Sequence, residues 1–245
     1  MIAVLADIHG NLPALEAVIA DLQQRKIDTV FNLGDHASGP LWPQETLTFL
    51  MQQPWVQIAG NHDRQLVQQP PATHGASDRY AFERLDEVQK NWLAALPASV
   101  HLPADILLCH GTPADDDRYL LETVAQGRVR PARWDEINQR LAGVTASLIL
   151  CGHTHMPRII QVNDMQLIVN PGSVGLPAYS DTAPEPHVME TGSPHARYAL
   201  LEKRAQGWHV ELIAVPYDHQ SAATQAHHNG RLDWEIALRT GYMQA

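Results

Sequence analysis

Short apolar runs alternate with segments of helical periodicity over the first third of the chain. Residues 2–6 and 29–33 are apolar runs of strand length, and residues 56–59 form a shorter third run. Apolar residues recur at helical spacing over residues 12–22, and residues 43–53 also have a helical pattern. Parallel strands need a crossover connection, which is usually a helix. This order therefore predicts an α/β fold with a mostly parallel sheet and helices on its faces.

The middle of the chain continues this pattern. Residues 64–100 are polar with an apolar stripe and predict helix. Two more apolar runs, at 105–109 and 147–151, predict buried strands. The segment between them, 115–142, has the pattern of a helical excursion over the surface.

The pattern changes after residue 156. Residues 158–162 and 166–169 flank a turn sequence, and residues 198–201 and 209–215 flank another, so both pairs predict hairpins and an antiparallel or mixed sheet. The intervening segment, 176–197, contains four prolines and no periodicity, so we expect an irregular loop that acts as a lid over a site. Residues 219–240 predict a C-terminal helix. We expect one domain over residues 1–245.

Composition and charge exclude several classes of protein. The chain has 245 residues with a net charge of −10, which disfavours binding to nucleic acid. No run of about 18 apolar residues is present, so no membrane span is expected. The first residues lack a signal-peptide pattern, and two cysteines cannot form a disulfide framework, so we expect a cytoplasmic protein. Composition leaves homo-oligomerisation open.

Five short motifs place possible metal ligands directly after apolar runs. They are Asp7-Ile-His9, Gly34-Asp35, Gly60-Asn61-His62-Asp63, His110-Gly111 and Gly152-His153-Thr-His155. The carboxyl ends of strands in an α/β sheet converge on one crevice, so we expect these motifs to meet. Asp7 and His9 are two residues apart, and in extended backbone both side chains would point the same way. His153 and His155 have the same spacing.

The number and type of these side chains indicate a centre with two metal ions. The candidate ligands are Asp7, His9, Asp35, Asn61, His110, His153 and His155. Seven ligands are too many for one tetrahedral ion and suit two ions that share a carboxylate. Oxygen and imidazole ligands without cysteine fit Mn²⁺, our first choice, or Fe, Zn, Ni or Co. Two ions roughly 3.5–4 Å apart could hold both the attacking and the leaving oxygen of a phosphoryl transfer.

The five motifs, in this order, resemble those of the calcineurin-like metallophosphoesterase superfamily. The resemblance covers roughly residues 1–175, and residues 170–175 resemble the loop that follows the last motif in small prokaryotic members of phosphodiesterase type. It implies a four-layer αββα sandwich, in which two mixed β-sheets are flanked by helices. It also implies in-line attack on phosphorus by a hydroxide that bridges the two ions.

The resemblance also implies a role for each residue. One metal would be bound by Asp7, His9, Asp35 and His155, and the other by Asp35, Asn61, His110 and His153. His62 matches a histidine that is not a ligand and that protonates the leaving group. Asp63 matches an acidic residue that orients this histidine.

Several functions fit the resemblance. A phosphodiesterase that acts on small phosphodiesters or nucleotides is our first interpretation, and a diadenosine tetraphosphate hydrolase or a serine/threonine protein phosphatase is the alternative. Asp63 stands where such protein phosphatases have glutamate, which weakens that alternative. A non-enzymatic scaffold fits less well because His62 is present. The motifs have few cationic neighbours, which favours a singly charged diester over a dianionic monoester.

A few other residues are candidates for contact with a substrate. They are Arg64, Tyr179, His187 and His195, and His36 is a weaker candidate beside Asp35. We expect Cys109 and Cys151 to be buried as small apolar residues. The acidic run at 115–117 is expected to be an exposed turn.

Overall fold

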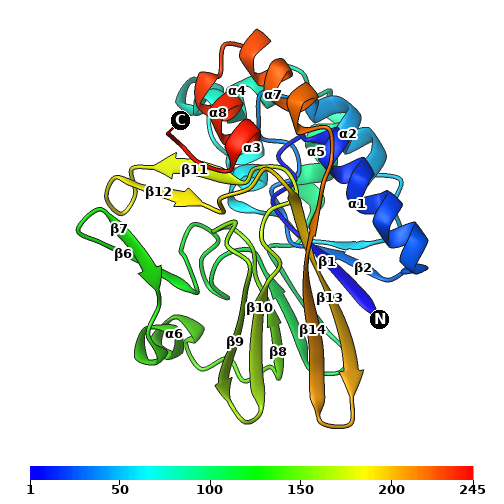
Figure 1. Ribbon diagram of the computed structural model, residues 1–245, viewed down its shortest axis with the longest axis vertical. Coiled ribbons are helices and arrows are strands. Elements are labelled where there is room, and N and C mark those ends of the chain that lie inside the picture. Colours follow the sequence, from blue (N-terminus) through cyan, green and yellow to red (C-terminus); the bar gives the residue numbers. More distant parts are fainter. Residues whose placement is uncertain (245) are drawn as a thin grey trace.

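The computed structural model describes residues 1–244 and consists of two five-stranded sheets packed face to face (Figure 1). The first sheet has the spatial order β14 (Gly207–Val215), β13 (Ala196–Arg204), β1 (Ile2–Leu5), β2 (Val30–Asn32) and β3 (Val56–Gln57). The second has the order β4 (Ser99–Leu102), β5 (Ile106–Cys109), β8 (Leu148–Leu150), β10 (Gln166–Asn170) and β9 (Arg158–Asn163).

Both sheets are mixed, as the sequence indicated. Strands β1, β2 and β3 are parallel, whereas β13 and β14 form an antiparallel hairpin beside them. In the second sheet, β5, β8 and β10 are parallel, and β4 and β9 are antiparallel edges. The parallel strands bring their carboxyl ends to one edge of each sheet, which is where the five motifs begin.

Helices cover the outer faces of the two sheets. The structure contains α1 (Leu12–Arg25), α2 (Pro43–Leu50), α3 (Asn61–Gln68), α4 (Ala76–Phe82), α5 (Glu87–Ala95), α6 (Trp134–Leu141), α7 (His219–His228) and α8 (Leu232–Thr240), with a 3₁₀ turn at Pro71–Thr73. Helices α1 to α5 pack against the first sheet and α6 packs against the second (Figure 1). Of the helices in residues 1–244, none is long and apolar enough to cross a membrane.

Alternate side chains along each strand are buried on opposite faces of the sheet, and this explains the four layers. In β1, Ala3 and Leu5 pack under the first layer of helices, whereas Val4 packs between the two sheets. In β5, Leu108 faces the first sheet and Leu107 faces α6. Successive side chains of a strand point to opposite faces, so strands with layers on both sides are apolar throughout. The predicted four-layer αββα sandwich is therefore confirmed.

The two cysteines lie in the core, as expected. Cys109 and Cys151 are both 1% exposed and belong to the apolar cluster between the second sheet and α6. Burial raises the pKa of the Cys109 thiol to about 12, so it stays protonated as a small apolar side chain.

Three segments differ from the sequence-based expectation. Residues 115–142 contain a hairpin, β6 (Glu122–Ala125) and β7 (Arg128–Pro131), before the short helix α6. Gln126 and Gly127 between these strands both have positive φ, which is the backbone of a two-residue hairpin turn. A glutamine in that position gave little sign of the turn in the sequence.

The prediction of an irregular loop at 176–197 was also wrong. This segment contains the hairpin of β11 (Ala178–Asp181) and β12 (His187–Glu190), with the prolines grouped mainly in its connection and flanks. The predicted single helix at 219–240 is two helices, α7 and α8. The helical conformation is interrupted between them at Gly230, whose φ is +74°.

Candidate metal centre

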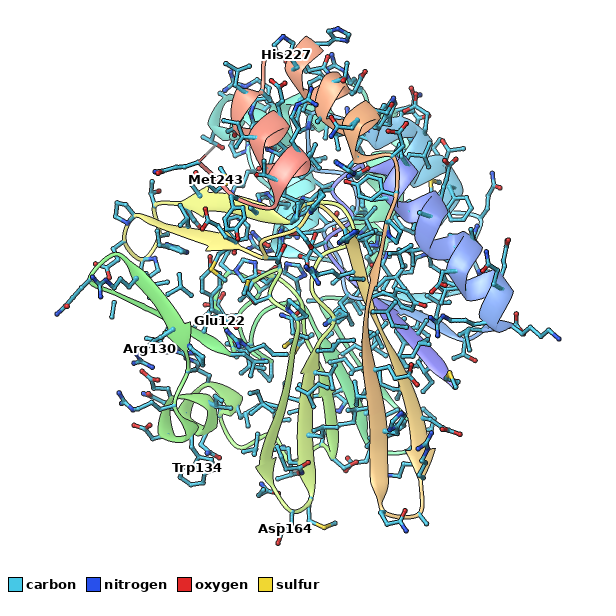
Figure 2. All side chains as sticks on the ribbon, in the orientation of Figure 1. Glu122, Arg130, Trp134, Asp164, His227 and Met243 are labelled. Carbon is cyan, nitrogen blue, oxygen red and sulfur yellow. The ribbon has the colours of Figure 1, made fainter. Side chains whose placement is uncertain are left out.

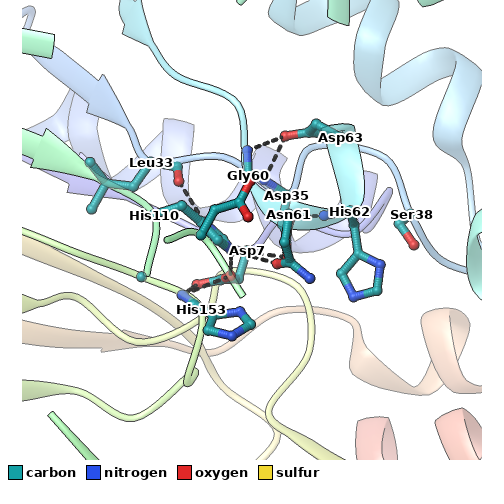
Figure 3. A network of polar contacts seen from close by, with 12 residues as sticks. Asp7, Leu33, Asp35, Ser38, Gly60, Asn61, His62, Asp63, His110 and His153 are labelled. Atoms are coloured by element: carbon teal, nitrogen blue, oxygen red, sulfur yellow. Dashed lines mark hydrogen bonds and ion pairs between the residues drawn. The ribbon is translucent and has the colours of Figure 1, made fainter. Parts of the chain in front are cut away.

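The seven candidate ligands lie together in one cluster at the carboxyl ends of the strands. Figure 3 labels five of them, Asp7, Asp35, Asn61, His110 and His153. Asp7 follows β1, Asp35 follows β2 and Asn61 begins α3 just after β3. From the second sheet, His110 follows β5 and His153 follows β8. The two sheets therefore contribute to the same centre from opposite sides.

Six of the ligands form two groups of three. Asp7, His9 and His155 form the first group, and Asp35, His110 and His153 form the second. Within each group, one ligand atom of each residue lies within 4.8 Å of the others. The seventh side chain, Asn61, contacts the second group, because its Oδ1 lies 3.0 Å from His110 Nε2.

Asp35 lies between the two groups. Its Oδ2 is 3.3 Å from His110 Nε2 in the second group and 3.8 Å from His9 Nε2 in the first. Asp7 also contacts both groups, at 3.5 Å from His155 Nε2 and 3.9 Å from His110 Nε2. Both carboxylates therefore contact both groups, and the bridging role expected of Asp35 stays a prediction.

Backbone carbonyls orient three of the four histidines. Nδ1 of His9 donates to the carbonyl of Ser38, Nδ1 of His155 to that of Leu176 and Nδ1 of His110 to that of Leu33, each at 2.7 Å. Each bond directs Nε2 toward the cluster. Hydrogen bonds of this kind fix the ring and its tautomer in metal sites.

His153 is oriented the other way round. Its Nε2 lies 3.1 Å from the carbonyl oxygen of Asp117, to which it donates, and this leaves Nδ1 for a metal. The carbonyl belongs to the turn at 112–118, which was expected to be merely exposed. In the structure, this turn holds a candidate ligand.

Strained backbone is concentrated at the cluster. Ten non-glycine residues in 1–244 have positive φ, and five of them are the candidate ligands Asp7, His9, Asp35, His153 and His155. Such conformations cost of order 1–3 kcal/mol each and persist where the surrounding structure imposes them, often at functional sites. The expectation of extended backbone at the two paired motifs was therefore wrong: the side chains meet through left-handed turns.

Two glycines allow the turns to approach the carboxylates. A Cβ on Gly60 would lie 2.2 Å from Oδ1 of Asp35, and one on Gly152 would lie 3.0 Å from Oδ2 of Asp7. Any side chain at residue 60 would collide with the carboxylate between the two groups. The glycines in these motifs are required by close packing.

The donor set fits two cations. Oδ2 of Asp35 is buried and has no hydrogen-bond partner in residues 1–244. Nε2 of His9 and Nε2 of His155 face each other at 3.1 Å, although each ring already donates from Nδ1. The only cationic group within 3.5 Å of this carboxylate oxygen in the described residues is His110, at 3.3 Å, and the two facing lone pairs of His9 and His155 repel each other. Cations bound at the cluster would relieve both.

The pKa values at the cluster describe a charged centre. Burial opposes the charged form of Asp35, but His110 and His62 hold the pKa of this carboxyl well below its ordinary value. Burial lowers the pKa of His9 to about 4, so its ring is neutral and can donate a lone pair. Burial also disfavours the charged form of His110, but Asp35 outweighs it and raises the pKa to about 10. A metal that binds there would release this proton.

His62 lies beside the cluster and is not part of either group. Its ring centroid is 5.7 Å from that of His9, and it lines the cavity in front of the site (Figure 3). Its Nδ1 is 2.9 Å from Oδ1 of Asp78, which also accepts a hydrogen bond from Ser38. Burial would lower the pKa of His62, but Asp35 and Asp78 raise it to about 9, so the ring keeps a proton.

The expected contact between Asp63 and His62 is replaced by the contact with Asp78. Asp63 accepts hydrogen bonds from the backbone N–H groups of Asp35, His36 and Gly60, at 2.8–3.0 Å. It also contacts Nδ1 of His36 at 2.7 Å. Asp63 thus holds the turn that carries Asp35. Asp78 on α4 was missed because no sequence motif marks it.

A cavity of about 850 Å³ opens in front of the cluster. It is lined on one side by His62 and five of the candidate ligands, and on the other by strands β6 and β11 and the start of α8. The five ligands are His9, Asp35, Asn61, His153 and His155. Its size lies within the usual range for small-molecule sites. The β11–β12 hairpin forms part of its wall, and a lid action of this hairpin stays a prediction.

The candidate substrate contacts have different outcomes. Tyr179 lines the cavity, donates to the carbonyl of His153 and packs its ring 4.7 Å from that of His155. Arg64 is paired with Asp116 and Asp117 and does not line the cavity. His187 and His195 are also outside the cavity wall, and His187 instead contacts the hydroxyl of Tyr119 at 2.9 Å.

The comparisons with known proteins agree with this geometry. A family model of the calcineurin-like phosphoesterase superfamily domain matches residues 1–192. An uncharacterised protein from Methanocaldococcus jannaschii is 25% identical over 258 residues, which cover 96% of this chain and 95% of the relative.

Two solved structures share the fold over their whole length. One is a metallophosphoesterase from Sphaerobacter thermophilus, with a TM-score of 0.76, 23% identity and 98% of both chains covered. The other is a hypothetical protein from Pyrococcus horikoshii, with a TM-score of 0.77, 20% identity and 99% of both chains covered. The chain therefore belongs to the calcineurin-like phosphoesterase superfamily and is a phosphoric ester hydrolase.

Proposed function

We propose that this protein is a phosphodiesterase that uses two divalent cations, with Mn²⁺ as the first choice, to hydrolyse small phosphodiesters. The observation that carries the proposal is the pair of adjoining three-residue groups. Asp35 belongs to the second group and also lies 3.8 Å from His9 of the first, and its buried Oδ2 has no hydrogen-bond partner in residues 1–244. Two cations at these groups would supply a water of lowered pKa and positive charge for the phosphoryl oxygens.

The residues of the chain have separate tasks in this reaction. Asp35 holds the two halves of the centre together, and its Oδ1 accepts the backbone N–H of His62 at 3.0 Å. Asp78 binds Nδ1 of His62, which leaves Nε2 of that ring free to face the cavity. A proton on Nε2 can pass to the departing alkoxide, which is a poor leaving group without it.

Metal removal is expected to abolish turnover. The candidate ligands are buried together, and no arginine or lysine of the described residues forms an ion pair with Asp7 or Asp35, so we expect the reaction to depend on the bound ions. We expect a chelator to reduce hydrolysis of bis(p-nitrophenyl) phosphate to background and added Mn²⁺ to restore it. Elemental analysis of the chelated protein is the control, and undiminished turnover by protein that contains no metal would contradict the proposal.

A diester is expected to be a better small substrate than a monoester. A monoester brings a second negative charge, and sites that prefer it supply arginine forks for that charge. Arg64 is neutralised by Asp116 and Asp117, and Arg231 by Asp233. The other two arginines that line the cavity, Arg118 and Arg140, lie on the wall beside β6 and α6 and not among the candidate ligands. We expect kcat/KM for bis(p-nitrophenyl) phosphate to exceed that for p-nitrophenyl phosphate with the same metal. The reverse order across metals would favour a phosphatase.

A further inference from the structure

The cavity extends well beyond the metal centre. Besides the ligands and His62, its wall includes β6, the last turn of α6 and the start of α8. A volume of about 850 Å³ is far more than one phosphoryl group needs. The cavity therefore has room for a second part of a substrate, and the groups on the wall away from the metal centre, here called the distal wall, indicate which chemistry would fit there.

Two arginines on this wall have no carboxylate partner. Arg118 and Arg140 both line the cavity, and neither forms an ion pair with any residue in the described range. Arg118 follows Asp117, whose carbonyl holds the candidate ligand His153. The exposed guanidinium of Arg118 makes no hydrogen bond within residues 1–244, so it is free to meet a ligand.

Arg140 is held rigidly in place by neutral acceptors. It donates to the carbonyls of Leu120 and Glu122, at 3.1 and 2.8 Å, and to the hydroxyl of Thr123 at 2.7 Å. These bonds use three of the five guanidinium N–H groups, and the other two remain for a ligand. Burial lowers the pKa of this half-buried arginine, the nearby charges of Glu136 and Glu122 oppose that shift, and the charge of Arg118 adds to it.

The other charged side chains on this wall are already neutralised or bonded. Arg231 is paired with Asp233, and Glu122 is paired with Arg158. Asp181 accepts the backbone N–H groups of the two residues that follow it. Two neighbouring arginines without a counter-ion therefore stand out in a chain whose net charge is −10. An unpaired cationic pair on a cavity wall is stabilised by an anionic ligand.

We propose that Arg118 and Arg140 form a subsite for a second phosphate group of the substrate, separate from the phosphate that is hydrolysed. The proposal rests on the proposed phosphodiesterase function and adds to it the class of substrate: a phosphodiester that carries a further phosphate, as in a nucleotide with a terminal phosphate. Planar guanidinium groups bind phosphate oxygens through parallel N–H bonds, and the free N–H groups of the two arginines provide them.

A matched pair of chromogenic diesters tests the subsite. The p-nitrophenyl ester of thymidine 5′-phosphate and its 3′-phosphate derivative have the same leaving group and differ only in the second phosphate. We expect the derivative to have a kcat/KM about tenfold higher, mainly through a lower KM, because a hydrogen-bonded charge pair of this kind is worth about that factor. Arg118→Gln should remove most of this preference, and Arg118→Lys should restore part of it.

Arg128→Gln is the control, because Arg128 is an exposed arginine on β7 that does not line the cavity. It should keep the preference of the unmodified protein. Arg140→Gln is a secondary test, since it also removes bonds to the β6 segment. Equal kcat/KM for the two diesters, unchanged by Arg118→Gln, would overturn the subsite and leave the phosphodiesterase proposal standing.

A binding measurement separates the two proposals if neither diester is hydrolysed. Calorimetric titration of the chelator-treated protein compares thymidine 3′,5′-bisphosphate with thymidine 5′-phosphate. We expect the bisphosphate to bind about tenfold more tightly, and Arg118→Gln to abolish the difference. Equal affinities in the unmodified protein would overturn the subsite independently of any turnover.

Discussion

Asp35→Asn is expected to lower both metal content and turnover. Asparagine has the same shape, and its side-chain oxygen can still accept the backbone N–H of His62. It lacks the charge that faces His110 and His9 at 3.3 and 3.8 Å. Loss of a residue that only supports a ligand costs about 10–100-fold in metal affinity or activity, and loss of the bridging ligand should cost more than the upper value.

Metal content by elemental analysis and kcat on bis(p-nitrophenyl) phosphate measure this effect. Asp164→Asn is the matched control, because Asp164 is exposed at the tip of the β9–β10 hairpin (Figure 2). It should keep full activity and metal content. If Asp35→Asn retains the metal content and rate of the unmodified protein, Asp35 does not bridge two ions.

His62→Ala is expected to lower kcat while both metals stay bound. His62 contacts Asp78 and belongs to neither ligand group, so its removal leaves the ligands in place. Loss of a general acid typically costs about 10²–10⁴-fold in rate. Asp78→Asn should produce a smaller loss of the same kind, since it weakens the contact that orients His62.

Elemental analysis and kcat with a diester that has an alkoxide leaving group, such as a dinucleoside monophosphate, provide the readouts, because p-nitrophenolate leaves without a proton. His228→Ala is the control, because His228 is an exposed histidine on α7. The assignment of His62 fails if the variant loses metal or keeps full kcat. Loss of metal would indicate that His62 is a ligand. An unchanged rate would indicate that another group transfers the proton.

The sequence predicts the buried strands because they carry a strong local signal, whereas the packing of two mixed sheets was implied by the family resemblance. Residues such as Val4 and Leu108 lie in short runs that are apolar on both faces, and only a strand between two layers needs such a run. The clustering of the candidate ligands follows from the same pattern, since each follows a strand whose carboxyl end meets the others. The position of each candidate ligand shortly after a strand was enough to predict that these residues lie close together.

The local conformation of the ligands could not be predicted in this way. Asp7 and His9 were expected in extended backbone, but both have positive φ, which the hydrogen bonds of the surrounding turns impose. Asp78 is brought to His62 by the packing of α3 on α4 and carries no motif of its own. Tertiary contacts decide both features, so neither has a signal in the sequence.

The distal wall of the cavity was missed for a similar reason. Arg118 and Arg140 lie in the segment expected to be a helical surface excursion, which is instead a hairpin followed by α6. The β6–β7 hairpin depends on a turn at Gln126 that has no strong sequence signal. With this segment misassigned, the arginines could not be placed on the wall of the cavity, and the site was expected to have few cations.

Anomalous scattering from a crystal grown with Mn²⁺ tests the central claim most directly. We expect two manganese peaks about 3.5–4 Å apart, one among Asp7, His9 and His155 and the other among Asp35, His110 and His153. Asp35 should lie between the two peaks. A single peak at full occupancy, or peaks only outside these two groups, would contradict a two-metal centre.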